Sequence, residues 1–166
     1  MQVITILGSN LGDKYQIIQD AVQSLSSIVG KFCAASSFYE TEPWGFECEE
    51  LFLNQVVEFE STLSPHQFLQ ACLETEKQLG RKRNPQTQGY SSRPIDIDIL
   101  FCDSLILDTA ELSIPHPRIC ERNFVLTPLV EIRPTFVHPI HLKTMTELLA
   151  ICPDKLGTKQ MQQFNM

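Results

Sequence analysis

Two aspartates, Asp96 and Asp98, stand one residue apart in the stretch "RPIDIDIL" at residues 93–100, which is otherwise typical of a buried strand. In a strand, residues i and i+2 point to the same face, so we expect the isoleucines on one face and both carboxylates on the other. Two neighbouring like charges destabilise a fold unless something cationic, such as a Lys or Arg side chain or a metal ion, lies between them. The alternative is an ordinary strand whose polar side faces solvent.

A basic segment leads into this strand. It runs from Lys77 to Ile95 and has five basic residues and no acidic one: Lys77, Arg81, Lys82, Arg83 and Arg93. Because the whole chain has a formal net charge of −7, such a segment indicates an anionic partner or a solvated loop. Arginine binds phosphate oxygens with paired hydrogen bonds, and Mg²⁺ is commonly held by one or two carboxylates together with substrate phosphates. Carboxylates beside arginines therefore predict a site for a magnesium nucleotide.

The familiar phosphate-binding motifs are absent from the sequence. "LGSNLGDK" matches the loop G-x-x-x-x-G-K-S/T only loosely, and the motifs of protein kinases do not occur. Any phosphoryl chemistry would use another architecture.

A second group of residues suggests a pocket for a flat ligand. Trp44 and Phe46 lie in a loop rich in Pro and Gly, and Asn54 is the polar exception in an apolar strand. The Asn54 amide offers both a donor and an acceptor, which suits a heterocycle with an amide-like edge. The alternatives are a tryptophan that plugs the core and an asparagine that bonds to the local backbone.

A third group lies in "IPHPRICERNF". His116 stands between two prolines, and Arg118 and Arg122 follow it. A positioned His and Arg beside a phosphate site could stabilise a leaving group. The alternative is a rigid surface loop.

The bulk properties exclude several classes of protein. A chain of 166 residues with 43% apolar residues suits one domain, and its acidic charge argues against a general nucleic-acid binder or a membrane-surface protein. The N-terminal apolar run is too short for a signal peptide and has no basic flank, and no apolar run is long enough for a membrane span, so we expect neither. The six cysteines form no C-x-x-C pair, and the sequence places no further ligand beside the "HPIH" histidines, His138 and His141. We therefore expect free thiols, no zinc and a cytoplasmic location.

The hydrophobic periodicity predicts the order β-α-β-β-α-β. The expected elements are strand 2–8, helix 9–28 capped by Asp13 or Asn10, strands 31–41 and 51–61, a helix from Ser64 to Gly80, a polar loop 81–94, strand 95–102 with 105–109 as its hairpin neighbour, and short helices within 125–132 and 145–151. The tail from about Lys155 is expected to fray. This order is the ferredoxin-like pattern, an α+β sandwich with two helices on one face of a mainly antiparallel sheet.

Together these residues resemble those of a known family. The motifs "SSFYETEPWG", "FLNQVV", E-x-x-x-GR-x-R, R-x-IDIDIL and IPHPR-x-x-ER-x-F-V-L-x-PL-x-EI-x-P resemble, in order and spacing, the 6-hydroxymethyl-7,8-dihydropterin pyrophosphokinases of folate synthesis. The resemblance runs from about Ile4 to Leu149. It implies the same ferredoxin-like fold and the transfer of the pyrophosphoryl group of ATP to the pterin hydroxymethyl. Two Mg²⁺ ions are implied between the paired aspartates and the triphosphate.

The resemblance also implies roles for single residues. The positions that resemble the pterin pocket are Thr41, Pro43, Trp44, Phe52, Asn54 and Phe124. Those that resemble the ATP site are Glu76, Arg83, Ile99, His116 and Arg122. Those that resemble catalytic residues are Arg81, Arg93, Asp96 and Asp98, of which the aspartates are also the metal ligands. The loop 82–94 resembles a lid that closes over ATP, with Tyr90 where the family often has tryptophan.

The implied partners are ATP and a small pterin, with association with other folate-pathway enzymes as a further possibility. A non-catalytic nucleotide or pterin sensor on the same fold remains the alternative. It would need the aromatic pocket but not the aspartate pair with its arginines.

Overall fold

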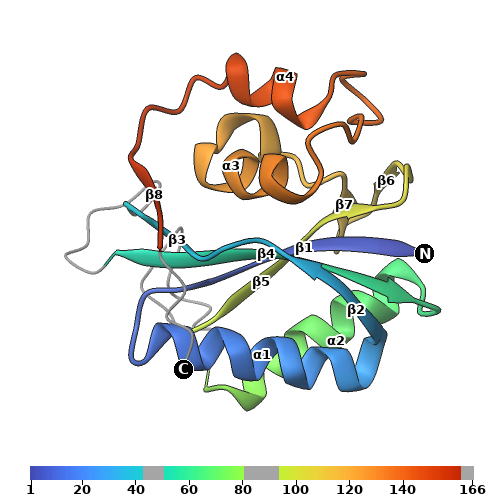
Figure 1. The fold of residues 1–166 in the computed structure, drawn as a ribbon. Coiled ribbons are helices and arrows are strands. Elements are labelled where there is room, and N and C mark those ends of the chain that lie inside the picture. Colours follow the sequence, from blue (N-terminus) through green and yellow to red (C-terminus); the bar gives the residue numbers. More distant parts are fainter. Residues whose placement is uncertain (43–50, 81–93, 162–166) are drawn as a thin grey trace.

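The computed structural model describes residues 1–42, 51–80 and 94–161, and Figure 1 shows its central sheet between two layers of helices. The elements are β1 (Gln2–Ser9), α1 (Lys14–Val29), β2 (Gly30–Ala35), β3 (Tyr39–Thr41), β4 (Phe52–Ser61), α2 (Pro65–Gln78), β5 (Asp96–Cys102), β6 (Leu107–Asp108), β7 (Ser113–Ile114), a 3₁₀ turn (Ile119–Glu121), α3 (Asn123–Ile132), α4 (Met145–Ala150) and β8 (Thr158–Gln160). The main sheet has the order β5-β1-β4-β3-β8, with β2 also paired to β4, and every pairing is antiparallel. The predicted α+β, ferredoxin-like order is confirmed.

The starts of α1 and α2 follow the predicted caps. The Asp13 carboxylate accepts the N–H of Gln16 at 3.2 Å. Ser64 and Gln67 form a reciprocal capping box, with proline in the first turn of α2. The buried residues of α1 are Ile18, Ala21, Leu25 and Val29, whereas Ile28 is 45% exposed.

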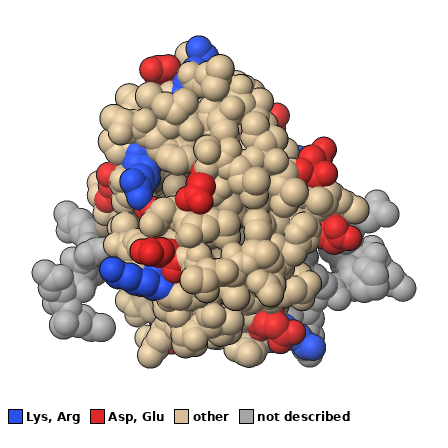
Figure 2. All heavy atoms as spheres, turned by 90° about the vertical axis from the view of Figure 1, so that its right-hand side faces the viewer, with Lys and Arg blue, Asp and Glu red and all other residues tan. Residues whose placement is uncertain are grey.

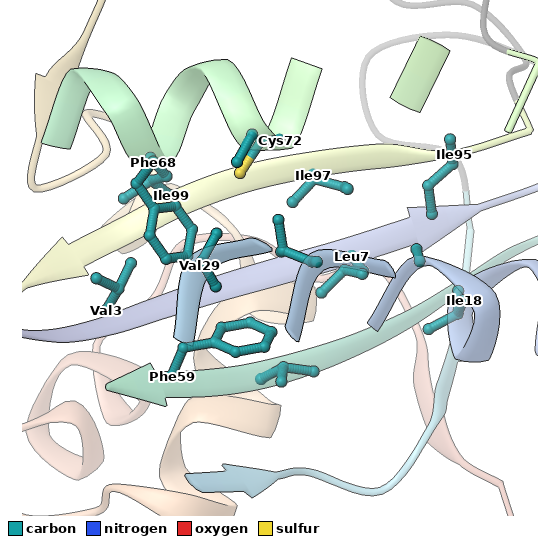
Figure 3. Packing of buried hydrophobic residues seen from close by; sticks show 14 of the residues in the cluster. Val3, Leu7, Ile18, Val29, Phe59, Phe68, Cys72, Ile95, Ile97 and Ile99 are labelled. Atoms are coloured by element: carbon teal, nitrogen blue, oxygen red, sulfur yellow. The ribbon is translucent and has the colours of Figure 1, made fainter. Parts of the chain in front are cut away.

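One apolar core fills the space between the sheet and the helices α1 and α2. Figure 3 shows side chains of α1, α2 and the central strands meeting there; those labelled are Val3, Leu7, Ile18, Val29, Phe59, Phe68, Cys72, Ile95, Ile97 and Ile99. The isoleucines of "IDIDIL" therefore point towards the helices, as predicted.

A second apolar core lies on the opposite face of the sheet, under α3 and α4 (Figure 1). The sequence prediction did not include this layer. The β1–β5 register shifts from Ile4–Phe101 to Thr5–Ile99, so Leu100 is an extra residue in β5. As a result Leu100 and Phe101 both pack in the second core, whereas strict alternation would have placed one of them on the other face.

Two segments before the C-terminus differ from the sequence prediction. Residues 31–41 form two strands, because after Ala35 the Ser36 amide and hydroxyl both bond to the backbone of Val56 and interrupt the ladder. Residues 105–109 do not pair with β5: β6 pairs with β7 in a separate two-stranded sheet. The reason is that β5 turns away at Asp103, which has a positive φ of 47°.

The predicted fraying of the tail is wrong for residues 158–160. They form β8, which pairs with β3 because the outer edge of β3 offers unpaired backbone groups.

The N-terminal amine donates to the Ser61 carbonyl at 3.0 Å, and Figure 1 shows that residue 1 lies far from β8 across the sheet. None of the described helices is long and apolar enough to cross a membrane.

Phe68→Ala should lower the free energy of unfolding by about 3–5 kcal/mol, because it removes a fully buried ring that packs 6.0 Å from the Phe59 ring. Phe32→Ala is the matched control, since Phe32 also contacts Phe59 but is 44% exposed. Urea unfolding of both variants measures the difference. Equal destabilisation would show that Phe68 is not a core anchor.

Candidate active site

The site is built around Gly8, near the end of β1. Gly8 pairs with Asn54 of β4 on one side and with Asp96 of β5 on the other. Cross-strand partners share a face, so Asn54 and Asp96 lie on the same side of the sheet, roughly 10 Å apart at two strand spacings. A Cβ atom at Gly8 would lie 2.6 Å from Asn54 Oδ1. The Asn54 carboxamide therefore covers backbone that only glycine leaves open.

The residues of β3 and β4 that resemble the pterin pocket lie close together in the structure. Asn54 Nδ2 donates to Thr41 Oγ1 at 2.9 Å, and both residues are buried. Phe52 pairs with Thr41 across the strands. The bond to Thr41 uses one amide hydrogen of Asn54 and fixes the orientation of its carboxamide. Phe124 lies in the first turn of α3, where the Arg122 guanidinium is 5.5 Å from its ring centroid.

The two aspartates lie on the predicted face. Asp96 is opposite Gly8 and Asp98 is opposite Ile6, and both are half-buried. Two carboxylates side by side at this depth are hard oxygen donors that still reach solvent. This donor set fits Mg²⁺, which keeps several waters and takes one or two carboxylates from the protein.

Glu76 of α2 and Ile99 of β5 lie at the outer edge of the sheet, which is formed by β5. The buried Glu76 reaches from α2, and its Oε1 accepts the N–H of Ile97 at 2.8 Å, which ties α2 to the strand between the aspartates. The Ile99 side chain is in the core on the face opposite Asp98, so it is not brought to the carboxylates. Ile99 is two residues after Ile97, so its backbone N–H and C=O point in the same direction as those of Ile97, away from β1 and towards the open edge of the sheet.

His116 lies near enough to Asp96 to interact with its charge, and its ring is neutral. Its backbone N–H donates to the Leu100 carbonyl at 3.0 Å, and its Nδ1 accepts the N–H of Arg118 at 3.1 Å. The neutral ring therefore carries its proton on Nε2. Burial and the nearby Arg122 lower the pKa of His116 to about 4, and Asp96 opposes this shift.

Arg122 places positive charge at the same end of the sheet. It is only 5% exposed and directly precedes α3, whose N-terminus adds positive potential. Arg122 and Asp96 both act on the charge state of His116, so groups of both charge signs lie near this histidine.

Residues 4–134 match the family model described as 7,8-dihydro-6-hydroxymethylpterin-pyrophosphokinase (HPPK). The chain belongs to this family. It is 42% identical over 134 residues to the 2-amino-4-hydroxy-6-hydroxymethyldihydropteridine pyrophosphokinase of Porphyromonas gingivalis, covering 80% of this chain and 90% of that one. The Aquifex aeolicus protein of the same name is 37% identical over 141 residues, covering 85% and 86% of the two chains.

Longer proteins also resemble this HPPK-family chain. Folic acid synthesis protein fol1 of Schizosaccharomyces pombe is 37% identical over 159 residues, which are 95% of this chain and 21% of that one. The crystal structure of wild-type Plasmodium falciparum HPPK-DHPS with pteroate matches 90% of this chain and 42% of that chain with a TM-score of 0.69. At 17% identity, that likeness supports the fold alone.

Several predicted residues of this HPPK-family chain lie outside the described residues. They are Pro43, Trp44, Arg81, Arg83, Arg93 and the lid segment 82–94 apart from Pro94. Their roles stay predictions.

Sequence reasoning missed Lys14, whose Nζ donates to the Leu51 carbonyl at 3.0 Å and holds the approach to β4. A lysine in the first turn of a helix stands at the unfavourable end for a cation, and that signal could have marked it.

The "HPIH" histidines have a neighbour that the sequence did not reveal. Within the described residues, Cys120, His138 and His141 are the one group of three potential metal-binding side chains, with ligand atoms within 4.8 Å of one another. However, His138 Nδ1 accepts the backbone N–H groups of Ile140 and His141, each at 3.2 Å. The ring proton is then on Nε2, so neither nitrogen presents a free lone pair to a metal. The cluster is better described as a cap of the turn.

Stability should fall as the pH drops from about 6.5 to about 4. The pKa values of His116 and His138 are lowered to about 4 mainly by burial, so over this range the unfolded state binds more protons than the folded state. His116→Asn should make the free energy of unfolding less dependent on pH, as measured by urea unfolding at pH 4.5 and 7. The exposed His66, replaced by Asn, is the control. An unchanged slope in the His116 variant would contradict the assignment.

Proposed function

We propose that this chain transfers the pyrophosphoryl group of ATP to the hydroxymethyl group of 6-hydroxymethyl-7,8-dihydropterin, giving AMP and the pterin diphosphate in folate synthesis. The observation that carries the proposal is the row Asn54–Gly8–Asp96 across three adjacent strands. It puts an amide suited to a heterocycle and a carboxylate suited to a metal on one face of the sheet. They are separated by two strand spacings, which is about the length of one small ligand. Membership of the HPPK family supports this assignment.

The pterin is proposed to bind over β3 and β4. Asn54, oriented by Thr41, pairs with the polar edge of the ring through its remaining amide hydrogen and its oxygen. Phe52 and Phe124, with Trp44 and Pro43, are proposed to enclose the ring. The hydroxymethyl group is then proposed to point from Asn54 towards Asp96, since both residues pair with Gly8 and lie on one face of the sheet.

Asp96 and Asp98 are proposed to hold two Mg²⁺ ions. When bound, these ions neutralise phosphate charge and favour the alkoxide form of the attacking alcohol. The aspartates supply the fixed anionic face, and the outer edge of β5 is held in place by Glu76. This division of roles explains why two charges are tolerated in a strand whose opposite face is core.

The nucleotide is proposed to lie along the outer edge of β5. The backbone N–H and C=O of Ile99 suit the hydrogen-bonding edge of the base, with Glu76 beside them. The Nε2–H of His116 and the guanidinium of Arg122 suit the phosphates, together with Arg81, Arg83 and Arg93. The alcohol oxygen bonds to the β-phosphorus while the bond from this phosphorus to the oxygen bridging the α-phosphate breaks, and AMP leaves with that oxygen. Charge grows on the phosphoryl oxygens during this step, and fixed donors stabilise it. Positioning and charge thus carry the reaction, and no dedicated general base is needed.

We also propose partners and a location for this reaction. The longer relatives named fol1 and HPPK-DHPS support an association of this chain with other folate-pathway enzymes. We place the reaction in the cytoplasm, with ATP as co-substrate.

An assay for AMP release with ATP, Mg²⁺ and 6-hydroxymethyl-7,8-dihydropterin tests the proposal against the non-catalytic sensor. AMP formation that requires all three components supports the enzyme. Pterin binding without AMP formation supports the sensor and removes the proposed function.

Asp98→Asn should lower kcat by roughly 10²- to 10³-fold in saturating Mg²⁺, because one anionic ligand is lost while the side-chain shape is kept. Asp103→Asn is the matched control, since Asp103 is exposed and directly follows the last residue of the same strand, at the end remote from Asp96. EDTA should abolish turnover of the wild type. Near-normal kcat in Asp98→Asn would mean that the pair consists of ordinary polar strand residues.

Asn54→Ala should weaken pterin binding by about tenfold or more, since an unmet amide edge in a buried site costs on the order of 1–3 kcal/mol. Binding of a non-hydrolysable ATP analogue should change little and serves as the internal control. Isothermal calorimetry measures both affinities. Equal pterin affinity in variant and wild type would place the pterin elsewhere.

A further inference from the structure

Glu131, near the end of α3, accepts hydrogen bonds from the segment that leads into β3. Its carboxylate accepts the Ser37 backbone N–H at 3.1 Å and 3.0 Å, the Ser37 hydroxyl at 2.6 Å and the Tyr39 hydroxyl at 2.8 Å. One side chain thus joins the helix to the first residue of β3. Charged acceptors make stronger hydrogen bonds than neutral ones, so this junction is firm although Glu131 lies at the surface.

The position of Glu131 is unfavourable for the helix itself. Glu131 is the penultimate residue of α3, and the C-terminal end of a helix repels an anion. The carboxylate therefore gains nothing from its own helix, and the donors of Ser37 and Tyr39 compensate for it. Burial raises the pKa of Tyr39 to about 12, and the hydrogen bond to Glu131 and its negative charge act in the same direction. The phenol therefore keeps its proton and remains a donor.

The opposite edge of β3 is held by the C-terminal strand. β8 pairs Gln160 with Tyr39 and Thr158 with Thr41. The Gln160 amide also donates to the same Ser37 hydroxyl at 2.9 Å. This strand lies beyond the residues 4–134 that match the family model. A strand of only three residues is thereby fixed by α3 and by β8 as well as by β4.

β3 carries the residue that orients the pterin-binding amide. Thr41 is two residues after Tyr39, on the same face and about 7 Å away. Its hydroxyl accepts from Asn54, which is the cross-strand partner of Tyr39. A shift of Tyr39 therefore moves both ends of the Thr41–Asn54 hydrogen bond.

We propose that Glu131 is a positioning residue for the pterin site, acting through Ser37 and Tyr39 on the orientation of Asn54. This inference rests on the proposed function. Glu131 touches neither substrate in this scheme. It sets the alignment of the amide edge that the pterin meets, and leaves the aspartate pair on β5 unaffected.

The test compares Glu131→Gln with Glu74→Gln. Glu74 is an exposed glutamate of α2 whose side chain makes no hydrogen bond within the described residues, so both variants lose one surface charge. Glu131→Gln should raise KM for the pterin roughly five- to tenfold while KM for ATP and kcat stay near the wild type, the pattern of lost substrate binding. Calorimetry should show the same loss of pterin affinity without turnover. Glu74→Gln should match the wild type in every parameter.

Tyr39→Phe gives a second, independent reading, because it removes only the hydroxyl that donates to Glu131. It should reproduce the rise in pterin KM, and adding it to Glu131→Gln should cause little further loss, since the two residues share one interaction. Equal rises in both KM values, or a pterin KM unchanged from Glu74→Gln, would overturn the inference. A wild type that binds pterin but forms no AMP would remove the proposed function, while the calorimetric comparison would still decide the role of Glu131.

Discussion

The register of β1 between β4 and β5 is the constraint on which the site depends. It alone brings Asn54 and Asp96, which are far apart in the chain, to the two sides of Gly8. A slip of one residue in either pairing would turn one of them into the opposite core. The apolar side chains on the other face of these strands prevent that slip, because it would expose them. Packing against α1 and α2 therefore specifies the site without touching it.

One face of the sheet changes character along a single strand. On β1, Ile4 and Ile6 lie in the core under α3 and α4, whereas Gly8, two residues further on, is the floor of the polar site. The extra residue Leu100 keeps β5 in step with this change, since it turns both itself and Phe101 into the core while Asp96 and Asp98 keep regular alternation. Burial at one end of the face thus gives rigidity to the charged groups at the other end.

Local patterns in the sequence were sufficient to narrow the cap of α1 to Asp13 or Asn10, of which the structure shows Asp13, and to predict the alternation of the isoleucines with the aspartates, because each depends on neighbours in the chain. The pairing of β8 with β3 could not be predicted, since a short polar strand carries no periodicity and its partner lies far away in sequence. The same applies to Glu131 and to the cover provided by α3. Their effects arise from contacts between residues that are far apart in the sequence. The only local sign of them is a negative charge, that of Glu131, near the C-terminal end of a helix, where an anion is unfavourable.

The positions of Met1 and β8 determine where a label, a tag or a solid support can be joined to the protein without disturbing the candidate site. The amine of Met1 bonds to Ser61 at the end of the sheet remote from β3, whereas β8 runs directly beside the strand that orients Asn54. A solid support, a fluorescent label or a purification tag joined at residue 1 would lie far from the candidate site and leave β3 open to solution. The same group joined immediately after β8 would lie beside β3, so its effect on ligand affinity would report how far that strand tolerates a disturbance at its outer edge.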